Sequence, residues 1–383
     1  MTEAPQILLS DPDMSDAELA AVAGVLRSPY LSSGPEVVAF EAEFAAYLGR
    51  GYAVAVSGAT PGLLCLLRAA QIGAGDEVIC SPHGFRETAH AIMLAGATPV
   101  FADIDYWSGT LSPAKAAEKI TPRTRAIMAG NNNGHPAPWD ALRALATAHG
   151  LHLIEDSTEA LGSRLHGQLV GTFGDAALFD FSSPSALSVG EGAMLVTDDA
   201  ALASAIRRHA GRRLAERGSV LATGTAPLQA AMSDLTAALG RAQLRRLPAL
   251  LERRKLTESL FALHMQSFEG LKPPYAAQDV TELHWMLYVV HLGTRFSRSS
   301  RDAIIDDLHV AGIAALAYSS PLHLQRLYFD QGYRRGDVLV TEKIADRAIA
   351  LPFHAHLTAD EIEFIVETLK DASVNIGAGA AIY

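Results

Sequence analysis

Short apolar runs rich in β-branched residues alternate with longer amphipathic segments through the first 160 residues. The runs that we expect to form strands are YAVAV (52–56), DEVICS (76–81), TPVFADI (98–104), RAIMAG (125–130) and LHLIED (151–156). Helical patterns lie between them and begin at Thr60, at Phe85, at Ser112 and around Trp139. Strands that alternate with helices in this way predict a mainly parallel sheet with right-handed crossovers, an α/β fold.

The flanking segments extend this pattern. Two helices are expected first, over 15–26 and 35–49, and Ser15 and Glu18 have the spacing of a capping box. Later strand-like runs cover 176–181, 192–198 and 284–292, and further helices are expected near 300–311, 340–350 and 359–372. We expect a large α/β domain over 1–245, then a long connecting helix and a small α+β domain over 246–383. The tail from Ser373 has a weakly ordered composition.

Composition and charge exclude several classes of protein. The 383 residues are 49% hydrophobic, enough for a large core, and the formal net charge of -11 argues against a nucleic-acid partner. No apolar run is long enough to span a bilayer and no leader pattern is present, so we expect a cytoplasmic protein without a membrane partner. Cys65 and Cys80 lack metal-ligand spacing and are expected to be buried thiols.

Polar loops follow the predicted strands. In an open parallel sheet, ligands bind beyond the carboxyl ends of the strands. The loops expected there are 57–62, 81–85, 131–136, 155–162 and 178–195. We therefore expect these five loops to line one cleft that binds a small-molecule substrate.

Read in order, the segments resemble the DegT/DnrJ/EryC1/StrS family, sugar aminotransferases of pyridoxal phosphate (PLP) fold type I. The resemblance runs nearly end to end. It includes GDEVI, AGATPVFADID, TPRTRAI, IEDSTEALGS, GTFGDAALFDF, GEGAMLVT, MSDLTAALGRAQL, PLHLQ and LPFHAHLT. It implies a fold-type I sheet, a small C-terminal domain and a homodimer in which the segment near residues 225–234 reaches the neighbour's cleft.

The resemblance also implies roles for single residues. Asp156 falls at the aspartate that pairs with the pyridine nitrogen of the cofactor, and Phe85 at the aromatic residue that stacks on its ring. Glu159 falls beside them, at a position held by Gln, Glu or His. Thr60 corresponds to a threonine in the loop that holds the cofactor phosphate at a helix N-terminus.

The catalytic lysine of the family is missing from its expected place. The family motif reads approximately F-S-F-x-x-x-K-x-L-x-x-G-E-G-G, and alignment on LFDFSSPSALSVGEGAML puts Ser185 at the lysine. Serine cannot form the imine (internal aldimine) to PLP, so ordinary transamination is not expected. The six lysines of the chain lie in amphipathic segments or a Pro-rich turn: Lys115, Lys119, Lys255, Lys272, Lys343 and Lys370. A catalytic base would have to come from His83, His135 or His90.

The phosphate-binding positions depart from the family as well. Asp180 replaces a serine that donates to phosphate, and a carboxylate pointing into the cleft would repel a phosphate dianion. Pro61 lacks the backbone N–H that its loop position offers. Gln229 replaces an asparagine that the partner subunit supplies. NNNGHP (131–136) stands where the family has H-x-Y-G-Q-P, which places His135 at a glutamine.

Three functions remain open from these observations. The first is a biosynthetic enzyme of secondary or amino-sugar metabolism that acts on a sugar-like or amine-bearing molecule through Ser185, His83, His135, Glu159 or Asp180. It would hold no PLP or pyridoxamine phosphate (PMP), or hold either weakly, and no metal. The second is a PMP-assisted enzyme like the sugar dehydratases of the family. The third is a non-catalytic paralogue that partners an active aminotransferase.

Overall fold

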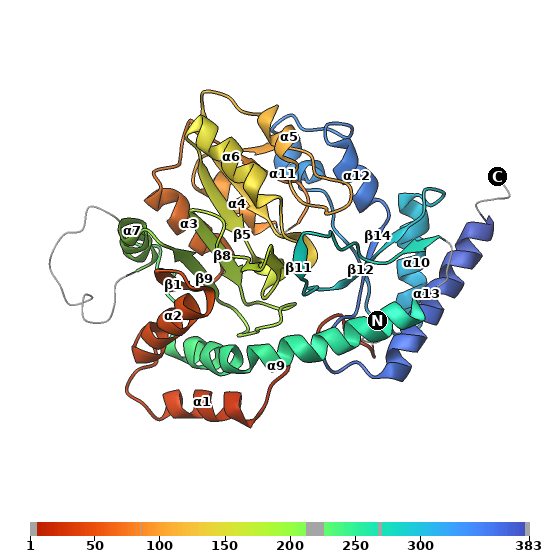
Figure 1. Cartoon of the computed structure of the whole chain (residues 1–383), viewed down its shortest axis with the longest axis horizontal. Helices are drawn as coiled ribbons and strands as arrows, with labels where there is room; N and C mark the ends of the chain where they lie inside the picture. The colour runs from red at the N-terminus through yellow and green to blue at the C-terminus, as the bar shows by residue number, and fades with distance from the viewer. Residues whose placement is uncertain (1–5, 85, 212–225, 267–269, 380–383) are drawn as a thin grey trace.

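A seven-stranded sheet forms the centre of the molecule (Figure 1). The computed structural model describes residues 6–84, 86–211, 226–266 and 270–379, with side chains as far as 376. The strands lie in the order β1 (Tyr52–Val56), β9 (Ala193–Thr197), β8 (Ala176–Asp180), β5 (His152–Asp156), β4 (Thr124–Gly130), β2 (Glu77–Cys80) and β3 (Thr98–Phe101). Strands β8, β5, β4, β2 and β3 are parallel, and β9 is antiparallel to both neighbours. The predicted α/β fold with a mainly parallel sheet is confirmed.

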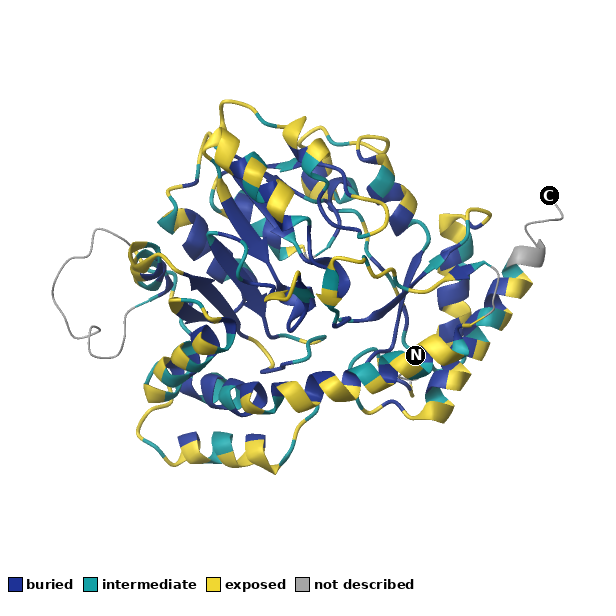
Figure 2. Ribbon diagram, viewed as in Figure 1, coloured by how far each residue is buried: buried dark blue, intermediate teal, exposed yellow. Residues whose placement is uncertain are grey.

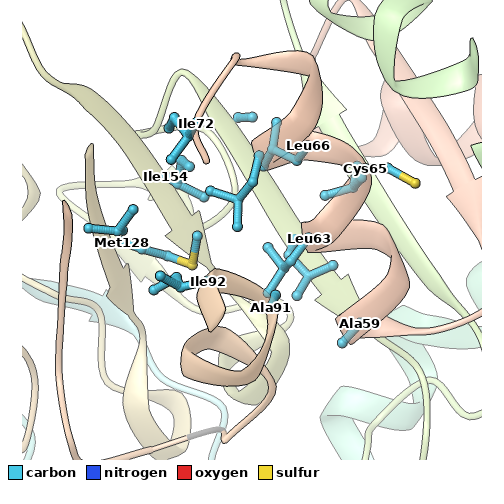
Figure 3. Close-up of a cluster of buried hydrophobic side chains, with 14 of the residues drawn as sticks. Ala59, Leu63, Cys65, Leu66, Ile72, Ala91, Ile92, Met128 and Ile154 are labelled. Atoms are coloured by element: carbon cyan, nitrogen blue, oxygen red, sulfur yellow. The ribbon is translucent and has the colours of Figure 1, made fainter. Parts of the chain in front are cut away.

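Helices cover both faces of this sheet because its side chains alternate between two apolar surfaces. The helices involved are α2 (Pro35–Leu48), α3 (Ala59–Ala69), α4 (Glu87–Leu94), α5 (Pro113–Ala117), α6 (Trp139–His149) and α7 (Ala200–Ala210). Val78 and Cys80 face α3 and α4, whereas Ile79 between them faces α6. Figure 3 shows the first surface, where Leu63 of α3 and Ile92 of α4 pack towards the sheet. The strands are consequently buried on both sides (Figure 2).

A second, antiparallel sheet belongs to the C-terminal part of the chain. Its strands lie in the order β10 (Leu271–Lys272), β12 (Tyr288–Leu292), β14 (Ala348–Leu351) and β13 (Leu316–Ala317). Helices α10 (Arg298–Val310) and α13 (Ala359–Gly379) pack on it. The long helix α9 (Asp234–His264) connects this part to the large sheet and passes residue 245 without a break (Figure 1). The division at residue 245 stays a prediction.

The remaining elements are short. A small sheet joins β11 (Val280–Glu282), β6 (Arg164–Leu165) and β7 (Gln168–Leu169). The other helices are α1 (Asp16–Leu26), α11 (Arg326–Phe329), α12 (Leu339–Ala345) and the 3₁₀ turns η1 (Asn132–Gly134), η2 (Thr158–Ala160) and η3 (Leu322–Leu324). Among the described helices, none combines the length and apolarity needed to cross a membrane.

Local predictions divide into confirmed and corrected ones. Ser15 and Glu18 form the predicted capping box of α1, and Cys65 and Cys80 are buried free thiols. The helix expected over 340–350 is wrong in its second half. Residues 348–351 form β14, because four buried residues pair there with strands on both sides. The first part of the tail is also better ordered than expected, since α13 continues to Gly379 and Ser373 is buried, whereas residues 380–383 lie outside the described residues.

Candidate functional site

A cavity opens where the parallel strands β2, β4 and β5 end. Carboxyl ends of parallel strands meet at one edge of a sheet, so the residues that follow them come together there. The space in it that a water molecule can reach is small, about 20 Å³. Its lining consists of Ser81, His83, Thr88, Met128, Gly130, Asn131, Asn132, Asp156 and Glu159. We call this the acidic cavity, after its two carboxylates.

Asp156 ends β5 and is buried in the wall of the acidic cavity. Its Oδ2 accepts a hydrogen bond from Thr88 Oγ1 of α4 at 2.9 Å, and its Oδ1 accepts from the Thr158 amide at 3.1 Å. Burial raises the pKa of Asp156, although these two donors oppose the rise. The carboxylate is therefore fixed in direction and gains from any positive charge that enters the cavity.

Glu159 lies one turn further along, in η2, and accepts hydrogen bonds from two sides. The Asn133 amide donates to its Oε2 at 2.7 Å, and the Tyr318 hydroxyl donates to the same oxygen. Burial raises the pKa of Glu159 to about 7, an effect that the two donors only partly offset. This carboxyl group can therefore take up or release a proton near neutral pH.

His83 separates the acidic cavity from a second one. Its Nδ1 lies 3.1 Å from the Gly109 carbonyl, and Nε2 has no hydrogen-bond partner among the described residues. Asn132 donates from Nδ2 to the same carbonyl at 2.5 Å. Burial lowers the pKa of His83 to about 4, and backbone carbonyls of Gly109 and Tyr318 oppose this. His83 is thus a neutral imidazole at physiological pH.

The second cavity, which we call the aromatic cavity, has about 40 Å³ that a water molecule can reach and shares His83 and Asn132 with the first. Most of its lining is aromatic or imidazole, and the full set is His83, Tyr106, Trp107, Ser108, Gly109, Asn132, Asn133, His135, Pro274, Tyr275, Trp285, Val289, His291, Tyr318 and Ile344. Rings of Tyr106 and Tyr275 both contact Trp107, which is 58% exposed at the rim. His135 stacks on Tyr275 at 6.1 Å, and its pKa is lowered by burial.

Asp180 ends β8 and points towards the N-terminus of α3. Its Oδ2 accepts a hydrogen bond from the Ala59 amide at 3.0 Å. Its Oδ1 accepts from the Ser182 amide at 2.8 Å and also from the Ser182 hydroxyl. The carboxylate is buried beside the acidic cavity without lining it. A side chain of the protein thus supplies the negative charge at this helix end.

The other residues implied by the resemblance do not line either cavity. Ser185 is partly exposed, and its Oγ accepts from the Leu187 amide at 3.3 Å. Thr60 is half-buried in the first turn of α3. Gln229 is exposed with a left-handed φ of 54°, beside Ala230, whose carbonyl accepts from the Ser57 amide at 2.7 Å. Phe85 lies outside the described residues.

These positions can be compared with what PLP or PMP needs. Asp156 is a buried carboxylate at a strand end and fits the pyridine nitrogen. The phosphate end does not fit, because Asp180 already takes the amide of Ala59 and would repel a dianion. No lysine or arginine lines either cavity within the described residues. The described residues therefore do not form a complete site for this cofactor.

Several residues of the site were not expected from the sequence. Thr88 and Tyr318 hold the two carboxylates, and the aromatic wall comes from loops that the sequence left unassigned. The pair Tyr106–Trp107, a few residues after β3, was the available signal. Asn131 proves to be structural, since its side chain bonds Trp139 Nε1 at 2.8 Å. Within the described residues, no three His, Cys, Asp or Glu side chains are grouped to hold a metal ion.

Fold and site together define an α/β protein with a small-molecule cleft at the carboxyl edge of its main sheet. Residues 12–370 match the model of the DegT/DnrJ/EryC1/StrS aminotransferase family, and the chain belongs to this family.

Three relatives illustrate the similarity. The spore coat polysaccharide biosynthesis protein SpsC of Bacillus subtilis is 35% identical over 94% of this chain and 95% of its own. The erythromycin biosynthesis sensory transduction protein EryC1 of Saccharopolyspora erythraea is 36% identical over 90% of this chain and 92% of its own. The crystal structure of the aminotransferase TlmJ from Streptoalloteichus hindustanus superposes with a TM-score of 0.89 at 31% identity, covering 99% and 100% of the two chains.

Proposed function

We propose that this protein is an atypical member of its family that binds a sugar-like, amine-bearing small molecule in the acidic and aromatic cavities. It acts on this molecule by proton transfer, without a lysine-bound cofactor. The observation that carries the proposal is the pairing of two buried carboxylates in a cavity whose described lining holds no lysine or arginine. The carboxylates of such a site attract a protonated amine and repel an anion.

The acidic cavity supports an amine of defined orientation. Asp156 is fixed by Thr88 and Thr158, so its remaining lone pairs are available in one direction. An ammonium group donating to Asp156 would relieve the cost of burying this carboxylate. Thr88 and Asn132 add neutral hydrogen-bonding groups to the same wall.

The aromatic cavity supports a ring beside that amine. Tyr275 and Trp107 offer flat apolar faces, and the carbon-bound hydrogens of a sugar ring pack well against such faces. His83 and Asn132 border both cavities, so a ligand whose amine lies at one cavity can place its ring at the mouth of the other. Participation of relatives in polysaccharide and erythromycin biosynthesis agrees with a sugar-like ligand.

Glu159 is the residue that we assign to proton transfer. Its pKa of about 7 gives it comparable acid and base populations near neutral pH. The hydrogen bonds from Asn133 and Tyr318 hold it in one orientation. His83 is the neutral partner across the cavity, and its Nε2 has no described partner that would compete with a ligand. Ser185, Asp180 and His135 are not assigned a chemical step.

Calorimetric titration with paired probes tests this proposal. D-glucosamine and a panel of aminocyclitols serve as amine-bearing probes, and D-glucose and the matching cyclitols as neutral ones. We expect saturable binding of at least one amine probe and at least about 10-fold weaker binding of its neutral match. Asp156→Asn should remove this difference, whereas Asp198→Asn, an exposed carboxylate that pairs with the buried Arg50 outside both cavities, should keep it. Equal binding of amine and neutral probes would overturn the proposal.

Other outcomes would favour the other two functions. Micromolar binding of PMP by the purified protein would favour the dehydratase-like enzyme. A stable complex with an active aminotransferase, without binding of any probe, would favour a non-catalytic partner. We also propose a homodimer, which sedimentation analysis would test.

A further inference from the structure

We infer that Asp180 is a specificity residue that closes the N-terminus of α3 to phosphate-bearing ligands. The inference rests on the proposed function and extends it, because it names the residue that makes this end of the cleft unfavourable for an anionic ligand. The two claims fail separately. Amine binding depends on Asp156, whereas phosphate exclusion depends on the contact between Asp180 and Ala59.

Backbone amides hold the carboxylate of Asp180 in the way that they hold a bound anion in an anion-binding site. Each carboxylate oxygen accepts a hydrogen bond from one amide, Oδ2 from Ala59 at 3.0 Å and Oδ1 from Ser182 at 2.8 Å. Asp180 is 5% exposed, and its amide donates to Thr158 Oγ1 at 3.2 Å. Strand β8 and η2 therefore fix the carboxylate in place.

The helix end has little capacity left for a second anion. Helix α3 has 11 residues, and the dipole of such a helix favours negative charge at its N-terminus. The Ala59 amide is taken by Asp180, Pro61 has no amide hydrogen, and the Gly62 amide donates within the helix to Gly58 at 3.1 Å. Among the described amides of this helix end, those of Gly58 and Thr60 remain for an external ligand.

Neighbouring charges add to the exclusion. Glu87 and Asp156 both lie within electrostatic range of Asp180. Arg86, the sequence neighbour of Glu87, has a side chain that is 69% exposed, and its Nε lies 3.8 Å from Glu87 Oε1. A phosphate dianion entering this region would meet several carboxylates and find its amide donor occupied.

Two variants of the full chain test the inference. Asp180→Ser vacates the helix end and supplies a hydroxyl donor, whereas Asp180→Asn removes the charge and keeps the shape. Calorimetry with inorganic phosphate and with PMP is the readout. We expect Asp180→Ser to bind both probes at least about 30-fold more tightly than the wild type. Asp180→Asn should gain less, and both gains should fall as ionic strength rises.

Asp234→Ser is the matched control. Asp234 is also a buried carboxylate that accepts helix-end amides, those of Gly34 at 2.8 Å and Val37 at 3.0 Å, at the start of α2. This variant should bind neither probe more tightly than the wild type. Circular dichroism establishes that each variant is folded. If Asp180→Ser does not fold, Asp180→Asn decides the question. Wild-type affinity equal to that of a folded Asp180 variant would overturn the inference.

Discussion

The hydroxyl of Tyr318 donates a hydrogen bond to Oε2 of Glu159, a residue 159 positions earlier in the chain. Tyr318 directly follows β13 of the small sheet, and Glu159 lies just beyond β5 of the large one. The Asn133 side chain makes a parallel connection, because its Oδ1 accepts from the Leu287 amide at 2.9 Å. The chemistry of the acidic cavity therefore depends on how the two parts of the chain pack together.

Replacing Glu159 with glutamine should change how stability depends on pH. The pKa of this carboxyl group rises from 4.5 in the unfolded chain to about 7 in the fold. The protonated form therefore favours the folded state below pH 4.5, and this contribution is lost as the pH rises through 7. Glutamine mimics the protonated form at every pH. Relative to the wild type, Glu159→Gln should gain about 3 kcal/mol of unfolding free energy between pH 4.5 and pH 8.

Urea denaturation of both proteins at the two pH values measures this difference. Glu363→Gln is a suitable control, since Glu363 is an exposed residue of α13. An unchanged stability difference between pH 4.5 and pH 8 would show that Glu159 titrates normally.

Removing the Tyr318 hydroxyl should lower the stability of the fold at pH 8, whereas Glu159→Gln should raise it. This hydroxyl stabilises the ionised form of Glu159, so its loss raises the pKa of the carboxyl group further. Tyr318→Phe should therefore cost about 1–3 kcal/mol of stability at pH 8 and clearly less at pH 4.5. Carbon-13 NMR titration of Glu159 would report the pKa directly. A fall in that pKa would contradict this account of the hydrogen bond.

The turn that carries Asn133 allows a test of close packing. Gly134 and Gly150 both have left-handed φ angles, of 89° and 64°. A Cβ atom on Gly134 would lie 2.4 Å from the His284 carbonyl oxygen, whereas one on Gly150 would meet nothing within 4 Å. Gly150→Ala should cost about 1 kcal/mol from backbone strain alone.

Gly134→Ala should cost about 3 kcal/mol or more, because the backbone of η1 or of His284 must shift. Thermal denaturation of both variants measures the difference. Equal losses would mean that η1 has more freedom than its contact with His284 implies.

Much of the fold could be predicted because the large sheet is encoded locally. Its strands are short β-rich runs, each bounded by a helical pattern, and the capping box of α1 lies within four residues. β14 was mistaken for a helix because AIAL carries no period, and only its pairing with two other strands makes it a strand. The order of α13 depends in the same way on packing with the second sheet.

Less of the candidate site than of the fold could be predicted from the sequence. Asp156 and Glu159 follow a clear strand, and their loop could be placed beside a cleft. Their partners could not be found in this way, because Thr88 and Tyr318 reach them through tertiary packing. The sequence predicted that Asp180 would repel a phosphate group. The hydrogen bond between its carboxylate and the Ala59 amide could not be predicted, because it depends on how β8 and α3 pack together.

The position assigned to Ser185 can be tested by restoring a lysine. If Ser185 occupies the lysine position of the family, a double variant, Ser185→Lys with Asp180→Ser, should form a covalent PLP adduct that borohydride reduces. Ser185→Lys alone should form much less, because Asp180 still blocks the phosphate end. Intact-mass spectrometry after reduction measures both. A folded double variant without an adduct would show that Ser185 does not take the place of the lysine.

Titration of the wild-type protein with PLP tests the central claim most directly. Calorimetry and visible absorbance should be followed together, after dialysis against a cofactor-free buffer. We expect no covalent adduct and at most weak binding, with a dissociation constant of about 1 mM or higher. Stoichiometric binding in the micromolar range, with an absorbance band that borohydride abolishes, would contradict the claim and return the protein to ordinary aminotransferase chemistry.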